Sequence, residues 1–126
     1  MNSFYYKIKS FSIFVMAIFY IVVGAHHFVD PDWYIQIVPP PFPYKSGIVY
    51  FTGIAEIILG SLLFFKTKRI LAGWGLIILL IAVYPANIYL ALTNGQAMNT
   101  TPFIAWSRLP IQFVFIALAY WHTKID

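Results

Sequence analysis

Four long apolar runs constrain the fold of this chain more than any other feature of its sequence. They cover residues 11–29, 47–65, 70–92 and 102–121. Each is close to the roughly 20 residues that an α-helix needs to cross a bilayer. Of the 126 residues, 61% are hydrophobic and 10% are charged, and a soluble core of this size could not bury so much apolar surface. We therefore expect one domain over residues 1–126, an all-α integral membrane protein with a four-transmembrane-helix bundle.

The basic residues predict how this bundle lies in the membrane. The segments between the runs lie alternately on the two sides of the membrane. Six Lys and Arg residues fall on the same side as the termini, and two fall on the opposite side. The six are Lys7, Lys9, Lys66, Lys68, Arg69 and Lys124, and the two are Lys45 and Arg108. By the positive-inside rule we expect both termini in the cytoplasm, at the inner membrane if the source is bacterial. The alternative of a cleaved signal peptide over the first run, ending at residues 23–25, stays open.

The outer loop over residues 30–46 contains a helix start followed by several prolines. Asp30 followed by proline is a typical N-cap, and Thr101 followed by proline predicts the start of the last span in the same way. The later prolines should end the short helix in an extended segment. Trp33 and Tyr34 suit the membrane interface. We expect an outer-side lid helix and a proline-rich loop over the mouth of the bundle, with Asp30, Trp33 and Tyr34 as lid residues.

Polar side chains inside the spans are costly in hydrocarbon, so each is a candidate for function. They are His26, His27, Glu56, Asn87, Arg108 and Gln112. With a rise of about 1.5 Å per residue, all of them fall in the outer half of their spans, which predicts one polar pocket beneath the lid. Glu56 should point into the bundle, because Gly53 and Gly60 on the same side of its helix would let a neighbouring helix approach closely.

Each of these residues also has a structural interpretation. Glu56 and Arg108 would form a buried ion pair that holds the helices in register. Asn87 would hydrogen-bond to a neighbouring helix. The internal prolines Pro85 and Pro110 each remove a backbone donor, so the carbonyls that they free need other partners. Both interpretations stay open for every residue.

The sequence argues against most kinds of cofactor site. Without cysteine there is no iron–sulfur cluster, thiolate zinc site or thiol relay. A bis-histidine haem needs matched depths on facing helices, whereas His26 and His27 are near the outer end and His122 is at the inner end. A metal site from a histidine with Asp30 and Glu56 has an unspecific spacing, so we predict no metal. The scattered basic residues form no nucleic-acid stripe, and whether the chain is an enzyme stays open.

Several short segments combine into a wider pattern. They are residues 24–28 (GAHHF), 37–40 (IVPP), 53–57 (GIAEI), 69–75 (RILAGWG), 84–89 (YPANIY) and 108–112 (RLPIQ). Together they resemble the DoxX family of small four-span membrane proteins. The resemblance implies a link to quinone, because DoxX-like proteins include subunits of thiosulfate oxidation with quinone as acceptor. The Gly-x-x-Glu element that ends at Glu56 is also distantly similar to NACHO-type receptor chaperones.

Two functions from different classes remain. The first is a pocket for a small hydrophobic or quinone-like ligand, in which the chain acts as a membrane subunit of an oxidoreductase system. The alternative is a non-catalytic membrane scaffold or assembly chaperone that contacts a partner membrane protein through the aromatic lid or through the helix face of Gly53 and Gly60. A homo-oligomer is compatible with both.

Overall fold

The computed structural model describes residues 3–124, which form helices joined by loops and contain no strand. The elements are α1 (Ser3–Val29), α2 (Pro31–Ile35), α3 (Lys45–Leu62), α4 (Arg69–Leu92), the 3-10 helix η1 (Gln96–Met98) and α5 (Pro102–His122). By length and composition, α1, α3, α4 and α5 could each cross a membrane. The predicted all-helical fold with four membrane-length helices is confirmed.

The helix ends differ from the apolar runs most clearly in α1 and α3. α1 begins at Ser3 rather than at residue 11, because polarity does not prevent the turns around Lys7 and Lys9 from being helical. α3 ends at Leu62, where the backbone hydrogen bonds change from the fourth to the third preceding residue. The N–H of Phe64 donates to the carbonyl of Ser61 at 3.2 Å. Apolar runs mark the length that suits lipid, whereas helix ends depend on backbone hydrogen bonds.

The lid helix α2 is present, but the loop after it is not extended. α2 begins after Asp30 with proline at its first position, although the Asp30 side chain makes no capping hydrogen bond. The N–H of Phe42 donates to the carbonyl of Pro39 at 3.0 Å and closes a turn. The predicted extended segment is therefore wrong, because proline also favours the first central position of a turn. At α5, the Thr101 side chain accepts from the N–H of Ile104 at 3.2 Å, so that cap is confirmed.

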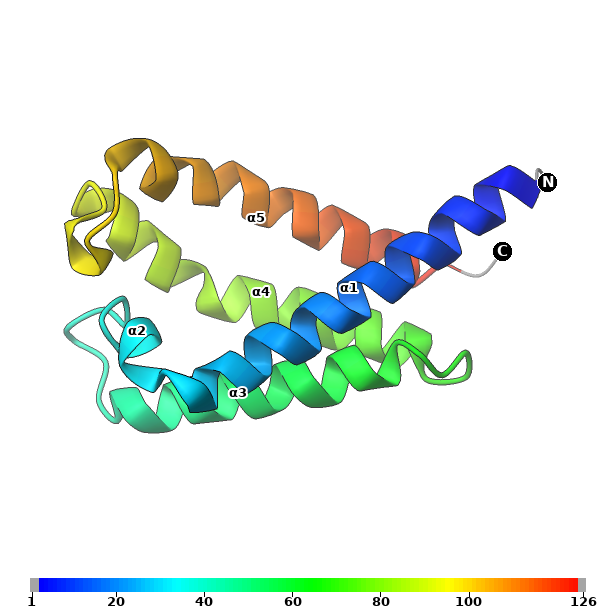
Figure 1. Ribbon diagram of the computed structural model, residues 1–126, viewed down its shortest axis with the longest axis horizontal. Coiled ribbons are helices and arrows are strands. Elements are labelled where there is room, and N and C mark those ends of the chain that lie inside the picture. Colours follow the sequence, from blue (N-terminus) through cyan, green and yellow to red (C-terminus); the bar gives the residue numbers. More distant parts are fainter. Residues whose placement is uncertain (1–2, 125–126) are drawn as a thin grey trace.

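The four long helices form two pairs (Figure 1). α1 packs mainly on α3, and α4 packs mainly on α5, while α3 and α4 join the pairs. The described chain ends lie together at one end of the bundle, which we call the terminal end. α2 and η1 lie at the opposite end, which we call the lid end. Residues from both connecting loops are therefore brought together at the lid end.

Two apolar clusters stabilise the bundle. The larger one joins α1, α4 and α5 with the end of α3 and includes Ala17, Leu63, Ala72, Leu76 and Ala119. The smaller one consists of Ile37, Leu90, Met98 and Ala105. It packs the loop after α2 and the 3-10 helix η1 against α4 and α5. η1, which the sequence did not predict, is thus part of the closed lid end.

α1 and α3 approach closely at glycines. A Cβ atom on Gly53 would lie 2.8 Å from Cβ of His27 and 2.9 Å from the carbonyl oxygen of Gly24. A Cβ atom on Gly60 would lie 3.0 Å from the carbonyl oxygen of Ala17. The glycine face of α3 is therefore occupied by α1. Of the two surfaces that the scaffold hypothesis offered to a partner protein, only the lid is left.

Candidate functional site

The lid end contains a cavity of about 390 Å³ bordered by α1, α3, α4, α5 and the lid segment. Its polar lining residues are His27, Tyr34, Thr52, Glu56, Asn87 and Arg108. The remaining lining residues are apolar. The lining residues that are exposed on the protein surface are Phe42, Phe51 and Ala82. Because all three are apolar, the open side of the cavity suits contact with lipid rather than with water.

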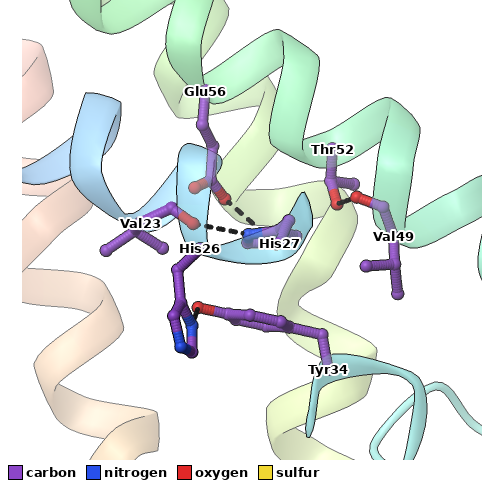
Figure 2. A network of polar contacts seen from close by, with 7 residues as sticks. All are labelled: Val23, His26, His27, Tyr34, Val49, Thr52 and Glu56. Carbon is purple, nitrogen blue, oxygen red and sulfur yellow. Dashed lines mark hydrogen bonds and ion pairs between the residues drawn. The ribbon is translucent and has the colours of Figure 1, made fainter. Parts of the chain in front are cut away.

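Glu56 faces His27 across the α1–α3 contact (Figure 2). Nε2 of His27 lies 3.9 Å from Oε1 of Glu56, and Nδ1 lies 2.7 Å from the carbonyl oxygen of Val23. Because a carbonyl can only accept, Nδ1 carries a hydrogen and donates it. Attraction at the other nitrogen then requires one proton on the facing atoms, either on Nε2 or on the carboxyl group. At 3.9 Å the two atoms do not form a hydrogen bond, and Oε2 of Glu56 is buried without a hydrogen-bond partner.

The predicted ion pair of Glu56 with Arg108 does not form, since no charged atoms of the two side chains lie within 4.0 Å in the described structure. Glu56 lies on α3, which packs on α1, whereas Arg108 lies on α5, which packs on α4. Nη1 of Arg108 instead donates to Sδ of Met98 at 3.1 Å. A thioether is a weak acceptor, so the guanidinium keeps donors for another group. Arg108 and Glu56 nevertheless line the same cavity.

Tyr34 connects the lid helix to both histidines. Its ring stacks on His27 with a centroid distance of 3.8 Å and an interplanar angle of 16°. Its hydroxyl forms a 2.7 Å hydrogen bond with Nδ1 of His26, as Figure 2 shows. Burial, and then the charge of Glu56, raise the pKa of Tyr34 to about 12, so the hydroxyl keeps its proton at neutral pH. The ring of Trp33 contacts that of His26 edge-on, with a centroid distance of 5.7 Å. The two aromatic lid residues thus pack α2 against α1.

Asn87 and Gln112 join α4 to α5. Nδ2 of Asn87 donates to Oε1 of Gln112, and Nε2 of Gln112 donates to the carbonyl of Leu80 at 2.5 Å. Gln112 is 3% exposed and donates to Leu80, which lies one residue before Ile81, whose carbonyl is the one that Pro85 frees. The interhelical role weighed for Asn87 is therefore present, although Asn87 and Pro85 also line the cavity. Pro110 is exposed on α5.

The structure brings His27, Glu56, Asn87 and Arg108 together at the cavity. His26 lies at the lid contact and Gln112 within the α4–α5 contact, and neither lines the cavity. Within residues 3–124, no three His, Asp or Glu side chains converge as a metal site would require. Ile37 and Val38 are 6% and 7% exposed and line the cavity, whereas the sequence named them only as part of the 37–40 segment of the resemblance and not as pocket residues. Apolar residues between a short helix and prolines have no periodicity that would place them.

One known protein family matches most of the chain. Residues 16–123 correspond to a family described as a domain of unknown function, DUF8561. The chain belongs to the DUF8561 family. The region of this DUF8561 chain that matches contains every residue that lines the lid-end cavity. No curated protein and no solved structure matches the chain. The family match does not test the resemblance to DoxX proteins, which stays a prediction.

Proposed function

We propose that this DUF8561 protein is a multi-pass membrane protein that binds a small hydrophobic, quinone-like ligand in the lid-end cavity. The observation that carries the proposal is a cavity with an apolar open side into which Arg108 and the Glu56–His27 pair project from different helices. Its volume of about 390 Å³ lies within the range of about 300 to 1,000 Å³ that is usual for small-molecule sites. The distribution of basic residues supports cytoplasmic termini, which would put the cavity in the outer half of the membrane.

The polar groups of the cavity suit a flat apolar ring with oxygens at opposite edges. Arg108 has five N–H donors, and the contact with Met98 uses one, so the guanidinium can also donate to a ligand carbonyl. A proton on His27 or on Glu56 can serve a second oxygen. The apolar open side lets such a ligand enter from the bilayer, where quinones dissolve. These contacts favour a neutral carbonyl compound over a water-soluble substrate.

Within an oxidoreductase system, this chain would supply binding and proton transfer. It contains no cysteine, so electrons would come from a partner protein rather than from a thiol pair of its own. The resemblance to DoxX proteins points to the same kind of assembly.

The first test blocks the cavity without changing its polar groups. Purified protein in detergent is titrated with a short-chain ubiquinone, and binding is followed by quenching of tryptophan fluorescence. Ala82→Phe places a ring at the open side of the cavity and should weaken binding at least about tenfold, or 1.4 kcal/mol. Ala117→Phe is the matched control, because residue 117 is exposed on α5 and does not line the cavity. Equal binding by both variants would show that the ligand lies elsewhere.

The second test removes the polar contacts one at a time. Arg108→Gln and Glu56→Gln each keep much of the side chain; the first removes the guanidinium cation, and the second removes a carboxyl group that can bind or release a proton. Loss of a hydrogen bond to a charged group costs about 1.5 to 3 kcal/mol, which corresponds to about 10- to 100-fold weaker binding. Thermal unfolding of each variant shows whether the bundle is retained. Wild-type affinity in both folded variants would contradict the proposed site.

A further inference from the structure

The terminal end contains a second cavity, of about 570 Å³, whose lining is strongly basic. It lies between the first turns of α1, the turn between α3 and α4, the start of α4 and the end of α5. Four of its described lining residues are Lys or Arg, and none is Asp or Glu. The four are Lys9, Lys66, Arg69 and Lys124. The cavity thus gathers positive charge from segments that are far apart in the sequence.

Neighbouring groups hold these cations at the cavity. Nζ of Lys9 donates to the carbonyl of Lys124 at 2.8 Å, and the Lys9 residue is 6% exposed. Nε of Arg69 donates to the carbonyl of Leu63 at 2.9 Å, which uses one of its five donors. Nζ of Lys124 lies 4.1 Å from the centre of the Tyr120 ring. A carbonyl and an aromatic ring carry no net charge, so Arg69 and Lys124 are not neutralised by these contacts.

The start of α4 adds to the same field. Thr67, Arg69 and Ile70 line the cavity around the first turn of this 24-residue helix. The N-cap residue Lys68 makes no side-chain hydrogen bond to the first turn, and that turn contains no acidic residue. The unpaired N–H groups and the dipole at the start of a long helix attract anions. Charge, dipole and concave shape therefore coincide.

We propose that this cavity binds the phosphoryl group of an anionic ligand, such as the headgroup of an anionic phospholipid. Lys and Arg side chains and helix N-termini are the groups that proteins use to hold phosphate oxygens. Basic pockets between membrane helices on the cytoplasmic side are suited to anionic headgroups, and the lining of this cavity also includes the apolar residues Ile13 and Ile70. This site is separate from the lid-end cavity, since the two share no described lining residue.

Lipid titrations test the proposal directly. Protein in an uncharged detergent is mixed with phosphatidylglycerol, phosphatidylcholine or inorganic phosphate, and adducts are counted by native mass spectrometry alongside thermal unfolding. We expect phosphatidylglycerol to bind and raise the unfolding temperature, and phosphatidylcholine to do neither. Equal protection by inorganic phosphate would assign the site to free phosphate. Equal binding of both lipids, or no binding of any anion, would overturn the proposal.

A matched pair of lysine variants places the ligand. Lys66→Gln removes a cation from the lining of the cavity. Lys68→Gln removes a cation from the same turn, but the side chain of Lys68 does not line the cavity. Both residues are exposed, so neither substitution disturbs the core. One lysine near an anionic surface is worth about fivefold in affinity, so Lys66→Gln should bind phosphatidylglycerol about fivefold more weakly. Lys68→Gln should bind as the wild type does. The same loss in both variants would indicate general surface attraction and overturn the cavity as the site.

Discussion

Replacing Gly53 by alanine should force α1 and α3 apart at the point where they bring His27 and Glu56 together. The new Cβ atom would lie 2.8 Å from Cβ of His27 and 2.9 Å from the carbonyl oxygen of Gly24. Ordinary contacts between such atoms are about 3.5 to 4.0 Å. Both neighbours are part of the α1 backbone or directly attached to it. A change of rotamer cannot relieve the overlap, so α1 itself must move.

The expected destabilisation is the balance of two opposing effects. An extra methyl group in a packed contact costs about 1 to 3 kcal/mol. Alanine in place of glycine inside a helix contributes about 0.5 to 1 kcal/mol in the other direction. With both effects at the middle of their ranges, the net loss in the free energy of unfolding should be about 1 kcal/mol. The same movement should weaken ligand binding in the lid-end cavity, because both His27 and Glu56 line it.

Gly47→Ala is the matched control on the same helix. The nearest neighbour of its new Cβ atom would be Cβ of Tyr44 at 3.8 Å, an ordinary contact. The substitution then changes stability only through the higher helix propensity of alanine, so this variant should be about 0.5 to 1 kcal/mol more stable than the wild type. Unfolding by a denaturing detergent, followed by far-ultraviolet circular dichroism, measures both variants. Equal stability of Gly53→Ala and the wild type, or a change of the same sign in both variants, would refute the reasoning.

Three further substitutions test other contacts. Gln112→Leu loses two interhelical bonds and should be about 1 kcal/mol less stable, since such bonds average about 0.6 kcal/mol in membranes; unchanged detergent unfolding would count against these bonds. Because the pKa of Tyr34 is raised from 10.0 to about 12, its protonated form stabilises the fold below pH 10 and this contribution is lost as pH approaches 12. Tyrosinate absorbance should therefore show one late-titrating group fewer in Tyr34→Phe. Thr101→Ala removes the cap of α5 and should cost about 1 kcal/mol in thermal or detergent unfolding, and no loss would contradict the cap.

The local features of this chain were predictable because their causes are local. The cap at Thr101 follows from a hydroxyl that satisfies the first turn of α5, and the start of α2 follows from the proline at its first position. The turn closed by Phe42 was not predictable, since a proline run is compatible with both an extended segment and a turn. η1 has no apolar periodicity of its own, and Met98 within it is buried in a cluster with Ile37, Leu90 and Ala105, which come from other parts of the chain.

The sequence by itself determined the four membrane-length helices, because span length and apolarity are properties of each run alone. It also indicated that Glu56 and Arg108 belong to one pocket, and both line the lid-end cavity. Only the tertiary structure decided that Glu56 faces His27 rather than Arg108, and that Tyr34 covers that histidine. The physical reason is that the partner of a side chain depends on which helices pack together. Here the close approach at Gly24 and Gly53 pairs α3 with α1.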